Sequence, residues 1–167
     1  MQAIILQNPI LQGFVYNVFV LMLRMFIAAQ ATGISKMIEM KKNKEKNLDE
    51  SKSSVDSEEK KSIWASRAEV AGNIHRNDVE NVSVFAMVCI PYVIVSSLSF
   101  GSLGNPQFAL WNSIIGNILM GSFTLSRIVY FPIYWNNLQP WRTLVWFWGV
   151  LSTVLLSIYT IICMYIL

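Results

Sequence analysis

The chain has 167 residues, of which 54% are hydrophobic and only 14% are charged. Soluble domains usually carry about 25% charged residues, so this composition excludes an ordinary soluble domain and indicates a membrane protein. The net charge of +3 does not form a basic face for nucleic acid, because all acidic residues and most basic ones share one mixed segment, residues 36–80.

Four apolar stretches are long enough to cross a bilayer, which requires about 20 mostly apolar residues. They predict an all-α fold, an integral membrane four-helix bundle that forms a single domain over residues 1–167. The predicted helices cover residues 9–40, 63–100, 107–133 and 140–167.

The first two helices are separated by a segment of very different composition. The first helix starts at Pro9, which suits a first helical turn, and Lys36 lies near its end. Residues 41–62 contain almost no apolar side chain, which predicts a mobile, charged loop. The lysines of this loop, and Arg127 and Arg142 on either side of the third loop, indicate that both loops are cytosolic and that both termini lie on the other side of the membrane.

The second predicted helix contains the polar run HRNDVEN, residues 75–81, and becomes apolar directly afterwards. We expect it to start as an amphipathic stem in the cytosol that carries a polar stripe to the membrane surface. The stripe follows i, i+3, i+4 spacing and consists of Glu69, Asn73, Arg76, Asn77 and Glu80.

The third and fourth helices bring polar groups to the same level. Charges inside a membrane bundle usually mark function, although interfacial anchors or interhelical salt bridges remain an alternative. The groups are Arg127, Tyr130 and Tyr134 at i, i+3, i+7, and Arg142, Thr143 and Trp146 at the start of the fourth helix.

These side chains indicate the ligand chemistry. Lys36, Arg76 and Arg142 would bind carboxylates, Glu80 would bind an ammonium group, and hydrogen bonds would come from Asn77 and Thr143. Glutathione has two carboxylates, one ammonium group and a thiol that a nearby arginine would activate.

The remaining ionisable residues of the polar run have structural interpretations. His75 is the only histidine, so no metal site is expected, and we predict an interhelical hydrogen bond for it. Asp78 lies off the Glu80 face and is predicted to pair with Arg127 of a neighbouring helix.

Four segments carry a family resemblance. The segment EVAGNIHRNDVENVSVF, residues 69–85, resembles the second-helix signature of the MAPEG family, membrane-associated proteins of eicosanoid and glutathione metabolism. It is similar to the branch that holds microsomal glutathione transferase and microsomal prostaglandin E synthase. ATGISKM, SRIVYFPIY and QPWRT are similar to other segments of that branch.

The resemblance implies a homotrimer in the endoplasmic reticulum membrane or the outer mitochondrial membrane, with glutathione as co-substrate between neighbouring subunits near the cytosolic side. It places Arg142 near the thiol sulfur and Asn77 and Glu80 against the tripeptide. Four residues depart from the family pattern and leave the second substrate open: Asn73, Tyr130, Thr143 and Trp146.

The function expected from these observations is a microsomal-type glutathione transferase for detoxification, with peroxidase activity toward lipid hydroperoxides and a lipophilic second substrate from the bilayer. The alternatives are a glutathione-dependent prostaglandin endoperoxide isomerase and a non-catalytic lipid-binding scaffold. The expected catalytic residues are Arg142, Tyr134 and Thr143, and the expected glutathione-binding residues are Lys36, Arg76, Asn77, Glu80, Tyr130 and Trp146.

Overall fold

The computed structural model describes residues 8–48, 55–102 and 106–166. In these ranges the chain is almost entirely helical and contains no strand, which confirms the predicted all-α fold. By length and composition, each helix can cross a membrane. The helices are α2 (Pro9–Leu48), α3 (Val55–Ser102), α4 (Pro106–Trp135) and α5 (Trp141–Ile166).

The start of α2 is fixed by Asn8 and Pro9. The Asn8 Oδ1 atom accepts the backbone N–H groups of Ile10 at 3.0 Å and Leu11 at 3.4 Å, as an N-cap residue does. Pro9 has no backbone N–H, but an N–H at the first position of a helix has no acceptor within the helix, so its absence costs little. The local sequence is therefore sufficient to start the helix here.

A tight turn over residues 136–140 reverses the chain between α4 and α5. Asn137 has a positive φ of 52°, a conformation that asparagine adopts more readily than most residues. The carbonyl of Pro140 accepts the backbone N–H of Thr143 at 3.0 Å, so Pro140 precedes α5 and helps to start it. This turn places Arg142 in the first turn of α5.

Helices α2 and α3 are longer than the sequence predicts. The segment predicted as a loop is helical over 41–48 and 55–62, which corrects the predicted boundaries. Lys and Glu are good helix formers, and neither segment contains Gly or Pro, so each helix extends outward from its packed part. Residues 49–54 lie outside the described part of the chain.

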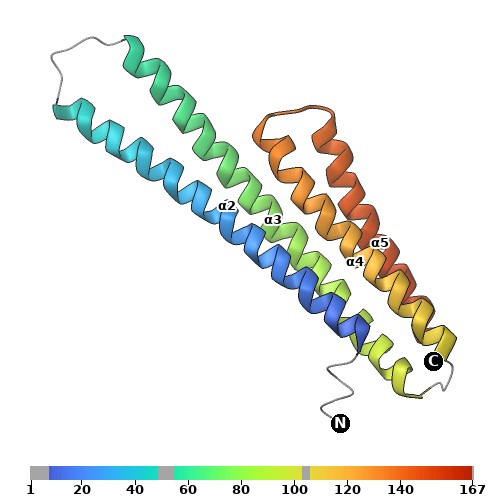
Figure 1. Ribbon diagram of the computed structural model, residues 1–167. Coiled ribbons are helices and arrows are strands. Elements are labelled where there is room, and N and C mark those ends of the chain that lie inside the picture. The colour runs from blue at the N-terminus through green and yellow to red at the C-terminus, as the bar shows by residue number, and fades with distance from the viewer. Residues whose placement is uncertain (1–7, 49–54, 103–105, 167) are drawn as a thin grey trace.

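The helices form two antiparallel hairpins, α2–α3 and α4–α5, which lie side by side (Figure 1). Helix α3 packs on all three other helices, whereas α2 and α5 do not pack on each other within the described ranges. The end of α2, the start of α3 and the α4–α5 turn point toward one end of the bundle, called the loop end below. The α2–α3 hairpin reaches beyond the α4–α5 turn at this end.

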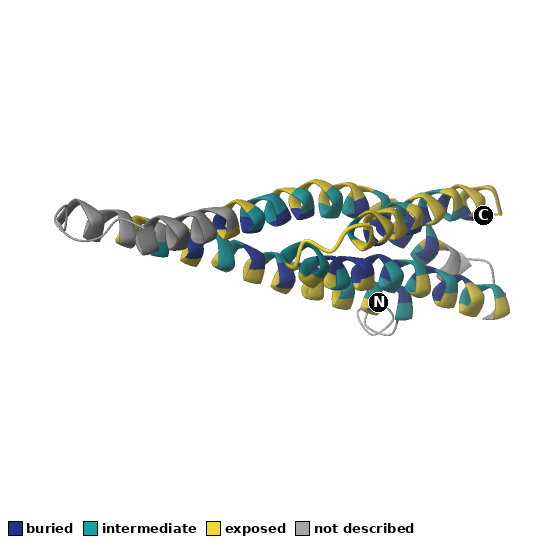
Figure 2. Cartoon of the chain, turned by 90° about the horizontal axis from the view of Figure 1, so that it is seen from above, coloured by how far each residue is buried: buried dark blue, intermediate teal, exposed yellow. Residues whose placement is uncertain are grey.

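The core lies between the helices, and exposed residues face outward along the bundle (Figure 2). At its centre, the rings of Phe85 in α3 and Phe123 in α4 stack with centroids 3.8 Å apart. The outer surface is rich in exposed apolar side chains, as expected where lipid replaces water. The buried core cluster consists of Ile10, Leu21, Phe85, Cys89, Tyr92, Val93, Met120, Phe123 and Leu156.

Polar contacts also join the helices inside the bundle. The Thr124 hydroxyl of α4 donates to Asn17 Oδ1 of α2 at 2.6 Å. The Tyr92 hydroxyl of α3 donates to the Asn112 carbonyl of α4 at 2.7 Å. Gly116 allows the second contact, because a Cβ at this position would overlap the Tyr92 hydroxyl. Small residues at membrane helix interfaces permit this kind of close approach.

Candidate functional site

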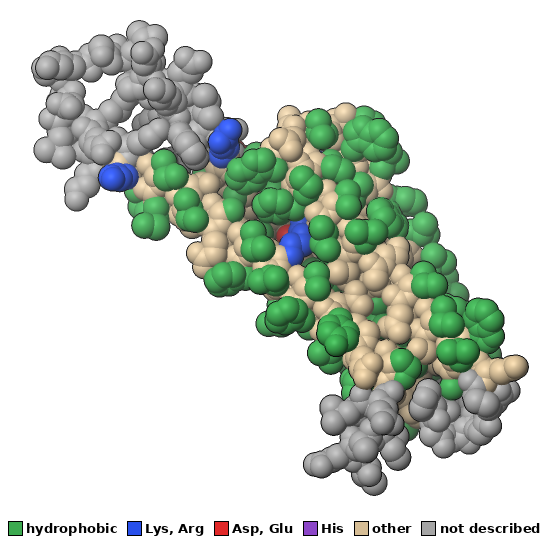
Figure 3. All heavy atoms as spheres, viewed as in Figure 1, with side chains coloured by type: hydrophobic (Ala, Val, Ile, Leu, Met, Phe, Trp, Pro, Cys, Tyr) green, Lys and Arg blue, Asp and Glu red, His purple; other side chains and the backbone are tan. Residues whose placement is uncertain are grey.

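A buried ion pair joins α2 and α3. Arg24 Nη1 contacts Asp78 Oδ2, and the two residues are only 7% and 0% exposed. Both lie in membrane-spanning stretches, where an unpaired charge is strongly unfavourable. Figure 3 shows a basic and an acidic side chain meeting in the middle of a largely hydrophobic face. The pair therefore fixes the register of the first hairpin.

This pairing corrects the prediction that Asp78 pairs with Arg127. The sequence indicates a charge at Arg24, but α2 reads as uniformly apolar around it, so nothing in the helical spacing singles it out. The available signal is physical: an arginine in a membrane helix needs an anion at its own depth, and Asp78 lies in the neighbouring antiparallel helix.

Arg127 is completely buried between α3, α4 and α5. Its guanidinium donates to Asn77 Oδ1 of α3 and to the Trp146 carbonyl of α5, both at 3.4 Å. It also lies over the ring of Phe123, with Cζ 5.2 Å from the centroid. A side chain at Gly149 would overlap the guanidinium, so this glycine opens the space on α5. Arg127 thus connects three helices at the level of the polar run.

Two tyrosines continue from Arg127 toward the loop end. The Tyr130 ring lies 5.4 Å from Arg127 Cζ and 5.4 Å from the centroid of the Tyr134 ring. The Arg142 guanidinium lies over the other tyrosine, with Cζ 4.4 Å from the Tyr134 centroid. Cations over aromatic faces are stabilised by about 0.5–2 kcal/mol. Arg142 is thereby held in position while part of its surface stays exposed.

The structure brings together only part of the predicted site. Asn77, Tyr130, Tyr134 and Arg142 are connected through Arg127, and Trp146 joins through its backbone carbonyl. Among the described residues, no hydrogen bond or ion pair connects the other candidates to this group. These are Lys36, Arg76, Glu80 and Thr143, all exposed.

Arg76 and His75 show how the polar run is arranged on α3. Arg76 Nη2 donates to Asn73 Oδ1 at 3.2 Å, consistent with the shared face predicted for these two residues. The His75 Nδ1 atom is buried and has no hydrogen-bond partner among the described residues, so the predicted interhelical bond is not formed through this atom.

The accessible charged side chains at the loop end favour a ligand that carries carboxylates and also an ammonium group. Exposed or partly exposed cations are present at Lys36, Arg76 and Arg142, and Glu80 is an exposed anion. An arginine held by its aromatic partner loses little freedom when a carboxylate or thiolate approaches. These groups could bind carboxylates at the cations and an ammonium group at Glu80.

Comparison with protein families gives one clear result: the model of the MAPEG family matches residues 14–162, nearly the whole chain. Comparisons with curated proteins and with solved structures gave no match. The four helices and their apolar character agree with this match and with an integral membrane protein. The chain is therefore an integral membrane protein that belongs to the MAPEG family.

Proposed function

We propose that the protein is a membrane-bound glutathione transferase of the branch holding microsomal glutathione transferase, and that it also reduces lipid hydroperoxides. Membership of the MAPEG family supports a glutathione-related function. The observation that carries the proposal is Arg142, whose guanidinium is held 4.4 Å over the Tyr134 ring and yet remains partly exposed. A cation that is fixed and accessible suits the stabilisation of a thiolate.

Glutathione binding would use the exposed residues around Arg142. Lys36 and Arg76 would bind its carboxylates, and Glu80 its ammonium group. Asn77 would donate or accept at the peptide from a position fixed by Arg127. Tyr130 and Trp146 would form the wall beside this position, and Thr143 would hydrogen-bond near the sulfur.

The chemistry follows from the thiol. A free thiol has a pKa near 8.5, and an adjacent guanidinium lowers the pKa of a bound thiol by favouring the thiolate. In the transferase reaction the sulfur forms a bond to an electrophilic carbon, the leaving group departs with the bonding electrons, and the thiol proton goes to solvent. Arg142 would act by stabilising the sulfur anion before the attack.

Reduction of a hydroperoxide uses the same thiolate. The sulfur attacks the terminal oxygen, the O–O bond breaks, and the alkoxide takes a proton to leave as an alcohol. The sulfenic acid of glutathione then reacts with a second glutathione to give the disulfide and water. Two thiols are oxidised and one peroxide is reduced, so no further reductant is required.

We further propose a homotrimer in the endoplasmic reticulum membrane, with the loop end in the cytosol. The lysines of residues 41–62, most of which lie at the end of α2 and the start of α3, support this orientation. Lys36, Arg76 and Glu80 are exposed on the single chain, which supports a glutathione site completed by a second copy.

The test is glutathione thiolate formation in the purified protein in detergent, followed by ultraviolet difference absorbance across a pH titration. Wild type should form bound thiolate well below the pH at which free glutathione ionises, and Arg142→Ala should lose this signal. Arg142→Lys is the matched control, because it keeps a positive charge and should keep part of the signal. Absence of thiolate and of glutathione binding in folded wild type would reject the transferase and favour a lipid-binding scaffold.

A further inference from the structure

The turn between α4 and α5, residues 136–140, lies directly between two membrane-spanning stretches. The spanning stretch of α4 ends at Trp135, and that of α5 begins at Trp141. The nearest charged residues along the chain are Arg127 before the turn and Arg142 after it. The α4–α5 turn therefore lacks the kind of charged segment with which α2 ends and α3 begins.

The two ends of the hairpins lie at different heights. The α2–α3 hairpin reaches beyond the α4–α5 turn at the loop end (Figure 1). A membrane helix is apolar across the hydrocarbon and carries its lysines and arginines where it enters water. The charged ends of α2 and α3 therefore mark the aqueous side, and the α4–α5 turn lies closer to the lipid than these ends do.

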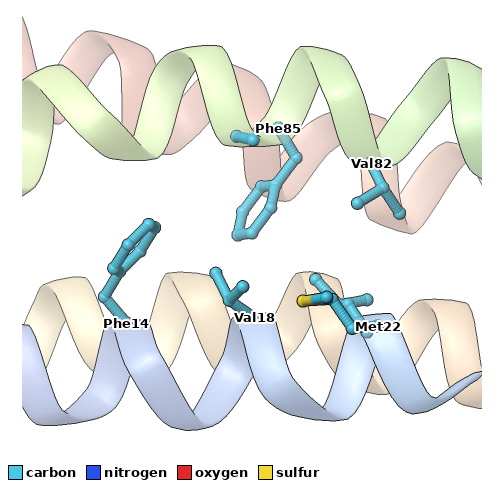
Figure 4. A pocket seen from close by; sticks show the side chains of 7 residues that line it. Phe14, Val18, Met22, Val82 and Phe85 are labelled. Carbon is cyan, nitrogen blue, oxygen red and sulfur yellow. The ribbon is translucent and has the colours of Figure 1, made fainter.

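Two large apolar side chains are exposed at the α4–α5 turn. In the middle of the bundle, apolar side chains of neighbouring helices face each other, as Phe14 and Val18 of α2 point toward Phe85 of α3 (Figure 4). At the turn, Leu138 is 48% exposed and Trp141 is 60% exposed. Tryptophan is enriched at the headgroup level of membranes, because its ring is apolar and its N–H is polar. The lipid-facing surface of the helices thus continues across the turn.

The backbone of the turn supplies its own hydrogen-bond partners. Each backbone N–H of residues 136–139 donates to a carbonyl of the turn or of the end of α4, at 3.0–3.1 Å, and Pro140 has no N–H. The carbonyls of Leu138 and Pro140 accept the N–H groups of Arg142 at 3.1 Å and Thr143 at 3.0 Å. Unpaired backbone groups are costly where water is scarce. This turn needs few hydrogen bonds from water, so it is suited to the headgroup layer.

We propose that the α4–α5 turn is a membrane-surface anchor that lies within the headgroup and ester layer at the loop end, with Leu138 and Trp141 inserted among the lipids. The partner of this surface is the bilayer, and not the open cytosol or a soluble protein. Arg142, which follows Trp141, then lies at the depth of the lipid phosphates. The inference goes beyond the proposed function and does not require that glutathione binds.

Spin labels measure the depth of the turn directly. Leu138→Cys is labelled with a nitroxide in phosphatidylcholine vesicles, and its collisions with oxygen are compared with its collisions with a water-soluble nickel complex. Lys41→Cys, at an exposed position of α2, gives the aqueous reference. Ile118→Cys, at a 63% exposed position of α4, gives the deep reference. Wild type gives the background, because Cys89 and Cys163 are buried.

The ratio of oxygen to nickel collisions should be several-fold higher at Leu138 than at Lys41, and lower than at Ile118. A ratio at Leu138 equal to that at Lys41 would place the turn in water and overturn the proposal. A label at Leu138 that is shielded from both reagents would also overturn it, because the turn would then pack against protein, such as a second copy of the chain.

Fluorescence tests the anchor without a cysteine substitution at Leu138. The emission that is lost in Trp141→Phe reports Trp141 alone. This part of the emission should be quenched by phosphatidylcholine brominated near the headgroup end of its acyl chains, and only weakly by acrylamide in the water. Strong quenching by acrylamide with none by the brominated lipid would contradict insertion of Trp141.

Discussion

Arg24 of α2 and Asp78 of α3 form an ion pair inside the membrane-spanning part of the bundle, and both side chains are almost completely buried. Arg127 donates to Asn77, the residue directly before Asp78 on α3. The Arg24–Asp78 pair crosses from the first helix to the second, next to the residues that the proposed glutathione site uses.

Replacing only one partner of this pair should be strongly destabilising. Arg24→Met leaves Asp78 without its ion-pair partner in a dry environment, which typically costs about 3–5 kcal/mol in the free energy of unfolding. The double variant Arg24→Met/Asp78→Leu should lose much less, because no acid is left unpaired. The free energy of unfolding in mixed detergent micelles is measured for wild type, Arg24→Met and the double variant.

Arg76→Met is the control for these variants, since Arg76 is exposed and, among the described residues, its side chain donates a hydrogen bond to Asn73 on its own helix. It should change the free energy of unfolding by less than about 0.5 kcal/mol. If the double variant is as unstable as Arg24→Met, the charges of Arg24 and Asp78 do not stabilise each other as an ion pair.

Two glycines of α4 should respond oppositely to alanine. A Cβ at Gly116 would overlap the Tyr92 hydroxyl and break its bond to Asn112, so Gly116→Ala should destabilise by about 1–3 kcal/mol. A Cβ at Gly121 meets no atom within 4 Å, so Gly121→Ala should be neutral or stabilise by up to about 1 kcal/mol. Thermal unfolding of the two variants compares their stabilities. Equal changes in stability would contradict the packing around Tyr92.

Two substitutions of Tyr134 distinguish the contribution of its ring from that of its hydroxyl group. Tyr134→Phe keeps the ring under Arg142 and should retain most glutathione thiolate formation. Tyr134→Leu removes the ring and should lower kcat/KM by about 2- to 30-fold, the equivalent of about 0.5–2 kcal/mol. If phenylalanine is as damaging as leucine, the hydroxyl contacts glutathione or the substrate directly.

The contact between α2 and α4 offers a double-mutant cycle. Thr124→Val removes the donor to Asn17 while keeping the shape of the side chain. Interhelical hydrogen bonds in membranes average about 0.6 kcal/mol and reach about 1.7 kcal/mol, so the coupling energy between Thr124→Val and Asn17→Leu should fall in this range. A coupling energy near zero would show that the 2.6 Å contact adds no stability.

The sequence is sufficient to predict the four described helices, because helix formation depends on local patterns. Each helix needs only enough apolar length, and Arg127, Tyr130 and Tyr134 are related by spacing along one helix. The ring contact between the two tyrosines therefore follows from the same spacing.

Two features depend on information that a local pattern does not contain. The partner of Asp78 depends on which helices are neighbours and at what depth. The sequence therefore favours Arg127 wrongly and does not identify Arg24. The end of α2 and the start of α3 lie in a charged segment whose composition alone predicts a loop. The helical conformation continues into this segment from the packed part of each helix. The positions of Lys36, Arg76 and Glu80 relative to a ligand stay predictions.

The arrangement of the two hairpins has a consequence for how the chain is assembled. The α2–α3 hairpin contains both partners of its buried ion pair, so its charges are neutralised before α4 is synthesised. Arg127 has no carboxylate partner of this kind on its own hairpin within the described residues, and its hydrogen bonds to other helices go to Asn77 of the first hairpin and Trp146 of α5. We therefore expect the second half of the chain to depend on the first during insertion, with the candidate site completed last.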